Sequence, residues 1–284
     1  MTTINRRGAL RAVGASVGAL LVSNAVYAAS KPVTRSVPNP DDPAMVDGVE
    51  AWKFAKIDPQ SVADQAYNDY PVGHCMHTTF KAIVDHVADA LETSDPLAAR
   101  AMKAFPFHMF HYGSSGGDGL GSLCGSLNGA MAAINLFVSN DKVRKAITNE
   151  LAIYYERTLL PVYEPDDAKN EPFPRTVANS VLCHVSSGKW CELAQVRSGS
   201  PERTERCSRL SADVAKKAAE LLNLNMAALN SADLAPVVSL KRSEPTATCV
   251  KCHDKGGDTG DVIGKMTCGE CHPEKTPDHH DRKE

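Results

Sequence analysis

Between residues 75 and 230, apolar side chains recur at the three- and four-residue intervals of an amphipathic helix. The stretch 75–92 places six apolar residues on one such face: Met76, Phe80, Ile83, Val84, Val87 and Leu91. Strand-like alternation is scarce, although 237–240 reads as a short extended connection. The pattern therefore predicts a mainly α-helical body.

Polar capping residues and prolines mark where further helices begin. Asn140 precedes a helix predicted to reach about Thr158, and Ser200-Pro201 opens a long final helix predicted to reach about Asn230. Another apolar helix is predicted over 122–138, where Gly125 and Gly129 stand one turn apart. Two glycines at that spacing allow a second helix to approach closely.

The pattern of apolar positions breaks down after Glu244. Residues 245–284 have few large apolar side chains, but they contain four cysteines and four histidines. Such a segment cannot bury enough apolar surface to order itself. A covalently bound group or a metal must therefore supply its core.

Two copies of one short motif provide for such a group. They are Cys249-Val250-Lys251-Cys252-His253 and Cys268-Gly269-Glu270-Cys271-His272. Cys-x-x-Cys-His is the pattern of c-type haem attachment, in which the two thiols bind the porphyrin covalently and the histidine ligates the iron. The segment 241–284 is therefore predicted to be a small, mostly irregular dihaem segment with His253 and His272 as proximal ligands.

The same four cysteines also satisfy the spacing of a four-cysteine zinc ribbon, which remains an alternative. The histidine after each pair favours haem, and few strand-forming residues surround either pair. A thioredoxin-like redox pair is disfavoured because no βαβ pattern is present.

Only fourteen residues separate the two motifs, and four of them are glycines. Two haems on one short segment must lie close together. Close haems without a dedicated cavity favour electron transfer, and no nucleophile elbow, paired carboxylates or phosphate loop stands in a convincing context. The chain is therefore predicted to be an electron carrier rather than an enzyme; a haem enzyme with an open iron site for a small inorganic substrate is the alternative.

The N-terminus resembles an export signal. Arg6 and Arg7 form a twin-arginine pattern, nineteen uncharged residues run from Ala12 to Ser30, and Val26-Tyr27-Ala28 resembles a cleavage site. Residues 1–29 are therefore predicted to be a twin-arginine-type signal peptide, with a helical domain over 30–240 and a periplasmic location. We expect no stable membrane insertion after cleavage.

The overall composition excludes several classes of protein. Apolar residues make up 43% and charged residues 23% of 284 residues, as in ordinary globular proteins. The formal net charge of −3 and the aromatic content of 6% argue against a nucleic-acid-binding surface.

Five further cysteines lie in the helical body: Cys75, Cys124, Cys183, Cys191 and Cys207. Cys75 and Cys124 are placed near the starts of helices, where backbone N–H groups favour the thiolate. A count of five cysteines suits four metal ligands plus one extra cysteine. The structural alternative is that these cysteines form disulfides or are buried as small hydrophobic residues.

The block Gly119–Ala130, centred on Cys124, resembles the glycine-rich pattern of the C_GCAxxG_C_C redox-active family. Cys75 fits the upstream cysteine of that family, and Cys191 and Cys207 resemble its paired downstream cysteines. Cys183 departs from the four-cysteine pattern, so which four of the five bind metal stays open. The order Cys124-Gly125-Ser126 also departs from the Gly-Cys-Ala order of the family.

With two haem motifs after this body, the chain resembles the split-Soret cytochromes c over roughly residues 70–275. The resemblance implies a periplasmic electron-transfer protein with two haems c and a [2Fe–2S] centre. It also implies a homodimer with its haems near the interface, bis-histidine iron, an axial ligand that crosses between subunits, and redox partner proteins. Twin-arginine export fits this picture, because it carries proteins already folded around a cluster made in the cytoplasm.

Two distal iron ligands are then needed from eight remaining histidines. The favoured candidates are His184 and His111, followed by His279 and His280, which lie near the second motif. Ordered side chains are favoured because fixing them costs less entropy.

Overall fold

The computed structural model describes residues 51–166, 172–242, 244–254 and 264–273. These residues belong to one compact unit that spans Glu50–Glu284. The predicted signal peptide and two candidate ligands, His279 and His280, lie outside the described residues.

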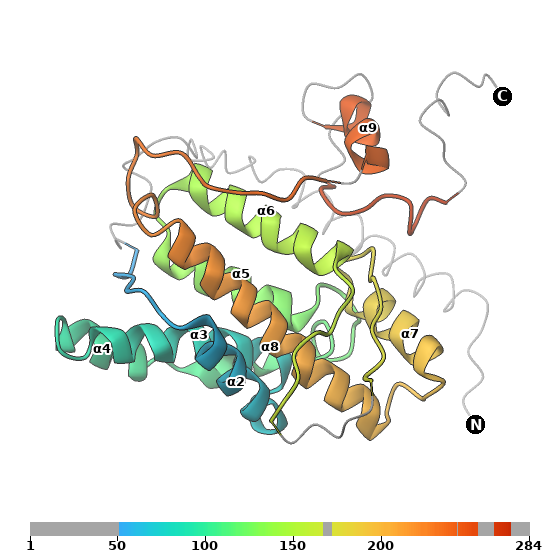
Figure 1. Ribbon diagram of the computed structural model, residues 1–284, viewed down its shortest axis with the longest axis horizontal. Coiled ribbons are helices and arrows are strands. Elements are labelled where there is room, and N and C mark those ends of the chain that lie inside the picture. The colour runs from blue at the N-terminus through green and yellow to red at the C-terminus, as the bar shows by residue number, and fades with distance from the viewer. Residues whose placement is uncertain (1–50, 167–171, 243, 255–263, 274–284) are drawn as a thin grey trace, which may run out of the picture. The chain divides into compact units, whose positions relative to one another are not determined.

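The described chain is helical, which confirms the predicted fold class (Figure 1). Its elements are α2 (Pro59–Asn68), α3 (Tyr70–Leu91), α4 (Pro96–Lys103), the 3₁₀ helix η2 (Phe107–Gly113), α5 (Gly125–Phe137), α6 (Asp141–Arg157), α7 (Cys183–Ala194), α8 (Pro201–Leu224) and α9 (Glu244–His253). Over the same residues, β-structure is limited to two isolated bridges, Leu123–Leu182 and Leu160–Thr176.

Side-chain caps explain where several of these helices begin. Asp58, Asp95 and Ser200 each accept a backbone N–H from the first turn of the helix that follows, and a proline comes next in each case. Asn140 caps α6 in the same way, through the N–H groups of Lys142 and Val143. Each such cap stabilises its helix by about 1 kcal/mol.

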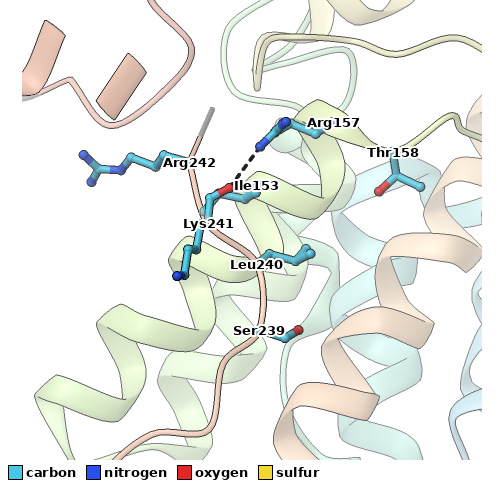
Figure 2. A pocket seen from close by; sticks show the side chains of 7 residues that line it. All are labelled: Ile153, Arg157, Thr158, Ser239, Leu240, Lys241 and Arg242. Atoms are coloured by element: carbon cyan, nitrogen blue, oxygen red, sulfur yellow. Dashed lines mark hydrogen bonds between the residues drawn. The ribbon is translucent and has the colours of Figure 1, made fainter. Parts of the chain in front are cut away.

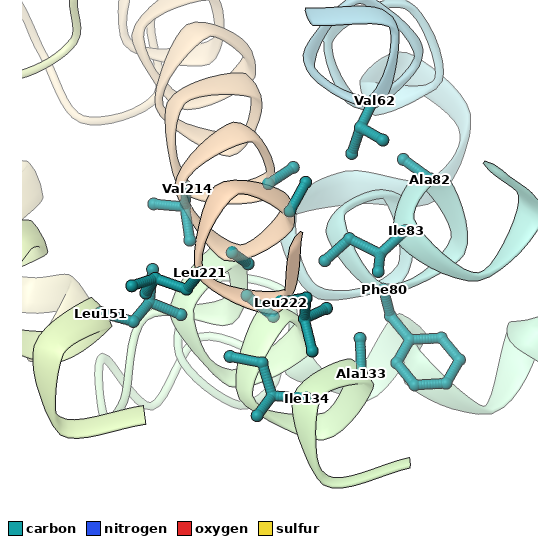
Figure 3. Packing of buried hydrophobic residues seen from close by; sticks show 14 of the residues in the cluster. Val62, Phe80, Ala82, Ile83, Ala133, Ile134, Leu151, Val214, Leu221 and Leu222 are labelled. Carbon is teal, nitrogen blue, oxygen red and sulfur yellow. The ribbon is translucent and has the colours of Figure 1, made fainter. Parts of the chain in front are cut away.

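The apolar core forms around α8, which contacts α2, α3, α5 and α6. Figure 3 shows Val214, Leu221 and Leu222 of α8 facing the other helices. The apolar face predicted for 75–92 is buried as expected, since all six of its residues belong to this core. A contiguous core of this kind leads us to expect that the body folds without a bound group.

Helices α3 and α5 approach each other closely, as Gly125 and Gly129 led us to expect. A Cβ at Gly129 would lie 2.3 Å from the carbonyl oxygen of Met76, and one at Gly125 would lie 2.4 Å from Cys75 Sγ. Larger residues at either position would force the two helices apart.

The final body helix is shorter than the sequence predicts, because α8 ends at Leu224 rather than near Asn230. Asn225 follows it and binds the returning chain: its Nδ2 donates to the Val237 carbonyl (3.0 Å), and the Val237 N–H donates to its Oδ1 (2.7 Å). The stretch 237–240 is extended without belonging to a strand. Its backbone N–H groups donate to the side chains of Asn225 and Glu150 rather than to a neighbouring strand.

This returning segment runs beside α6 toward α9 (Figure 1). Glu150 of α6 is buried and accepts both the N–H (2.7 Å) and the hydroxyl (3.0 Å) of Ser239. Farther along, Arg157 donates to the carbonyl of Lys241 at 3.1 Å. These hydrogen bonds to α6 therefore fix the position of the chain just before the segment that carries the two Cys-x-x-Cys-His motifs.

The helix α9, which the apolar pattern did not predict, carries the first of these motifs at its C-terminal end. Among the described residues, no helix combines the length and apolar character needed to cross a bilayer.

Candidate functional site

Four body cysteines come from four different helices. Cys75 belongs to α3, Cys124 is the residue before α5, Cys183 is the first residue of α7, and Cys207 lies in α8. All four are buried, with at most 8% of each residue exposed. Residues far apart in the sequence thus place thiols in the interior of one unit.

These four thiols share one electrostatic environment. Burial, together with negative charge on Cys124 and Cys207, raises the pKa of Cys75 and of Cys183 to about 12. We call Cys75, Cys124, Cys183 and Cys207 the body thiols. Four thiols in one dry region cannot all ionise unless a cation or a metal compensates their charge.

Local backbone features bring the body thiols together. Helix α3 is broken at His74, which has a positive φ of 57°, so Cys75 begins its second helical piece. The N–H of Cys124 donates to Val181 O (2.9 Å), and the N–H of Cys183 donates to Ser122 O (2.7 Å). This short antiparallel pairing fixes the start of α5 beside the start of α7.

A glycine-rich loop between Gly113 and Gly121 covers the same region. Gly116 has a positive φ of 74°, and a Cβ there would lie 2.9 Å from Cys183 Cβ. The hydroxyl of Ser122 and its N–H both donate to the Gly116 carbonyl, which closes the loop. The glycine allows this backbone to pass directly against the thiol site.

Two arginines of α8 face the body thiols. Arg206 is buried; its Nη1 lies 3.8 Å from Cys207 Sγ, and its Nη2 donates to Ser186 Oγ at 2.6 Å. Burial lowers its pKa, but negative charge on Cys207, Tyr155 and Cys124 outweighs that effect and raises it. Arg203 is half-buried, and Cys207 is the main cause of its raised pKa.

The site also holds polar atoms that the protein leaves without a partner. Within the described residues, neither Arg206 Nε nor the Tyr155 hydroxyl has a hydrogen-bond partner, although both are buried. Burial raises the pKa of Tyr155, and the charge that adds most to this effect is that of Cys124. Buried polar groups without partners are rare and point to a group that the site is built to hold.

Cys191 stands apart from the body thiols. It lies eight residues beyond Cys183 on α7, a rise of about 12 Å along the helix axis. It is not among the strongest influences on the pKa of Cys75 or Cys183.

The body thiols are neighbours rather than a finished coordination shell. In the described ranges, no three His, Cys, Asp or Glu side chains are already close enough to ligate one metal ion. Their donor chemistry, burial and facing arginines nevertheless fit a thiolate-bound metal cluster.

The two Cys-x-x-Cys-His motifs meet each other. The first ends α9 with Cys249, Cys252 and His253, and the second forms a turn in which the N–H groups of Cys271 and His272 donate to Cys268 O. Burial, followed by the charge and the hydrogen bonding of Cys249, raises the pKa of Cys268. Groups attached at the two motifs would therefore lie close together.

Two contacts fasten the second motif to the body. Glu156 of α6, which is buried, accepts the N–H of Thr267 at 2.9 Å, and Lys189 of α7 pairs with Glu270 at 2.6 Å. Burial raises the pKa of Glu156, while the Thr267 N–H and two arginines act against that rise.

The two candidate distal ligands within the described residues lie on the body. His184 is exposed at the start of α7, and its N–H donates to Gly121 O at 3.0 Å. His111 is exposed in η2, with its ring centre 4.7 Å from that of His77. Their assignment to an iron stays a prediction.

Arg203, Arg206, Tyr70 and Tyr155 surround the thiols without having been predicted. Tyr70 packs against Cys75 and Cys207 in a small buried cluster. The adjacency of Arg206 and Cys207 is the single hint that the sequence offers, because Tyr155 comes from a helix far away in the chain.

Comparisons with known proteins agree with this picture. Residues 74–221 match the family described as "Putative redox-active protein (C_GCAxxG_C_C)". The chain is 34% identical over 233 residues to split-Soret cytochrome c of Desulfovibrio desulfuricans (strain ATCC 27774 / DSM 6949 / MB). The matched region covers 80% of this chain and 79% of that protein.

A solved structure is similar as well. It is described as a novel iron centre in the split-Soret cytochrome c from Desulfovibrio desulfuricans ATCC 27774. It matches with a TM-score of 0.67 and 33% identity, over 78% of this chain and 90% of that one. These matches show that this chain belongs to the split-Soret cytochrome c family and support a role as a redox electron-transfer cytochrome.

Proposed function

We propose that this chain is a periplasmic electron-transfer protein that carries two haems c in its C-terminal segment and a [2Fe–2S] centre on its body thiols. Cys249, Cys252, Cys268 and Cys271 would attach the haems, with His253 and His272 as proximal iron ligands. When bound, these groups supply the one-electron couples.

Charge balance supports an iron–sulfur centre on Cys75, Cys124, Cys183 and Cys207. An oxidised [2Fe–2S] unit with four thiolates is doubly negative, and Arg203 and Arg206 bring two positive charges to the same place. Metal binding displaces the protons that burial otherwise holds on these thiols. Cys191 is the cysteine left over.

The accessibility of the other four cysteines supports haem attachment. Cys249, Cys252 and Cys268 are half-buried and Cys271 is exposed, so a porphyrin can reach all of them. The first motif lies on the helix α9, whereas a zinc ribbon would place it in a turn between strands. Family membership also favours haem over zinc.

One observation carries the proposal of electron transfer between the two sites. Tyr155 and Glu156 are consecutive residues of α6: Tyr155 faces the body thiol Cys124, and Glu156 binds the N–H of Thr267, next to Cys268. Their Cα atoms lie about 3.8 Å apart. One turn of α6 therefore contacts both a body thiol and the second haem motif.

Helix α7 provides a second connection. It begins with the body thiol Cys183, and two turns later Lys189 pairs with Glu270, inside the second motif. Both helices hold the second motif against the part of the body that carries the thiols. We therefore expect the second haem, rather than the first, to exchange electrons with the body centre.

Iron and sulfide analysis with magnetic resonance tests this proposal. The matured protein should contain about four iron atoms and about two labile sulfides per chain. In the reduced cluster, we expect faster electron-spin relaxation when a paramagnetic second haem is present than in a C268A/C271A variant. Equal relaxation in both proteins, or the absence of labile sulfide, would overturn it.

Carbon monoxide separates an electron carrier from a haem enzyme. Two bis-histidine irons should bind little carbon monoxide at neutral pH, whereas an enzyme with an open iron site should bind it readily. Turnover of a small oxyanion or peroxide would favour the enzyme.

Location and assembly are further parts of the proposal. Arg6 and Arg7 are expected to direct twin-arginine export, and a homodimer is expected to bring the haems of two subunits together. Replacing both arginines with lysine should abolish periplasmic accumulation, and sedimentation of the matured protein should give a dimer mass.

A further inference from the structure

A pocket of about 470 Å³ opens between the end of α6 and the segment that leads to α9 (Figure 2). It is lined by Ile153, Arg157, Thr158, Ser239, Leu240, Lys241 and Arg242. None of the body thiols lines it. The pocket therefore lies outside the site described for them.

The lining joins apolar side chains to positive charge. Ile153 and Leu240 supply the apolar part, whereas Arg157, Lys241 and Arg242 bring three cations and no lining residue is acidic. Arg157 also donates to the Lys241 carbonyl at 3.1 Å, which keeps the two sides of the pocket together (Figure 2). This combination suits a ligand with an apolar body and carboxylates at one edge.

The pocket lies beside the second haem motif. Arg157 follows Glu156, whose carboxylate binds the Thr267 N–H just before Cys268. The charge of Arg242 acts on both Glu156 and Cys268. A flat group attached at Cys268 and Cys271 can therefore extend toward these cations.

We propose that this pocket receives the propionate edge of the haem attached at Cys268 and Cys271, with Arg157, Lys241 and Arg242 paired to its two carboxylates. The inference rests on the proposed function, since it requires a haem at the second motif. It assigns a role to three residues that no haem motif contains.

These three cations should change the reduction potential of the second haem. Reduction adds one negative charge to the haem, so nearby cations favour the reduced state and nearby anions oppose it. Removing the cations should therefore make the second haem harder to reduce. Removing the Glu156 charge should act in the opposite direction.

The test uses R157Q, K241Q, R242Q and the triple variant of the matured protein. Arg157 and Lys241 are exposed, so neutral replacements remove charge without opening the core. Lys145 is an exposed cation earlier on α6 that pairs with Asp141, so K145Q is the matched control. Spectroelectrochemistry and the propionate bending band in resonance Raman spectra are the two readouts.

In the triple variant, we expect the ratio of reduced to oxidised second haem at a fixed potential to fall about tenfold, with a shifted propionate band. The control K145Q should change neither. The same substitutions in a C268A/C271A background should leave the remaining haem unchanged.

Two results would overturn the inference: an unchanged potential and band in the triple variant, or an effect that persists in the C268A/C271A background. Failure of the proposed function can be distinguished from failure of this inference, because the intact mass of the unsubstituted protein would then show no haem.

Discussion

The helical body and the haem segment of this chain place their cysteines in opposite environments. In the body, all four thiols are buried: Cys124 and Cys183 belong to the main apolar core, and Cys75 and Cys207 lie in a small cluster with Tyr70. In the described side chains of 246–254 and 264–273, Thr246 is the single buried one, and the motif cysteines are half-buried or exposed. The body has its own core, whereas the haem segment has almost none.

Under the proposed function, this difference would let the two sites acquire their groups at different stages. A thiolate-bound cluster is protected when water is excluded, so its ligands come from helices that close around it. Covalent attachment of haem requires thiols that remain accessible once the body has folded. One chain can therefore fold around the first group and receive the others afterwards.

Removing the cysteines of one haem motif should produce the largest effect, because the haem is then either attached or absent. C268A/C271A and C249A/C252A should each lose the mass of one haem and leave the unfolding midpoint of the body unchanged. Intact mass spectrometry and thermal unfolding followed by helical circular dichroism measure both quantities. Collapse of the body in either variant would contradict its independence.

A cavity in the body core should lower the stability of the body without changing haem attachment. Phe80 is 2% exposed, so Phe80→Ala should lower the free energy of unfolding of the body by about 3–5 kcal/mol. Haem stoichiometry in the folded fraction should not change. Leu120 is 85% exposed, and Leu120→Ala is the control, with an expected change below about 0.5 kcal/mol.

The buried carboxylate of Asp213 should make the stability of the body depend on pH. Burial raises its pKa to about 7 from 3.8, although it accepts the Val162 N–H at 2.8 Å. Because the folded state holds the proton more tightly, its contribution is complete below about pH 4 and is lost as the pH rises through 7.

Over that window the slope is at most about 1.4 kcal/mol per pH unit. Asp213→Asn keeps an acceptor oxygen and cannot ionise, so it should flatten the decline and be the more stable protein at neutral pH. Chemical denaturation at several pH values measures the slope, and identical slopes in both proteins would contradict this account of Asp213.

Arg206 should show opposite effects with and without the body cluster. A buried guanidinium facing thiols is costly without a counter-charge, so Arg206→Met should leave the cluster-free body equally or more stable. In the loaded protein, losing this charged donor should weaken cluster retention by about 1–3 kcal/mol.

Release of iron to a chelator and denaturation of the cluster-free protein are the two measurements. Arg100, which is exposed on α4, gives the control Arg100→Met. Loss of stability in the cluster-free protein with normal cluster retention would show that Arg206 has only a structural role.

The sequence was sufficient to predict the features that depend on local patterns. The apolar face at 75–92, the caps Asn140 and Ser200 and the close approach at Gly125 all appear in the structure. Each of them depends on neighbouring residues or on one helix face. The haem motifs are likewise local, since five consecutive residues define each one.

Features that depend on distant residues could not be predicted. The grouping of Cys183 with Cys124 arises from a backbone pairing between 122–124 and 181–183, and α8 ends early because Asn225 binds Val237. The charge around the thiols comes from Arg203 and Arg206, which no periodicity singles out. Choosing among five body cysteines required the tertiary structure.

The central claim is that the body folds by itself whereas the haem segment orders around its porphyrins. Amide hydrogen exchange on protein made with and without haem attachment tests it most directly. We predict strong protection of α3, α5 and α8 in both samples, and protection of 244–254 and 264–273 only when the haems are attached. Equal protection of the haem segment in both samples, or loss of body protection without haem, would contradict the claim.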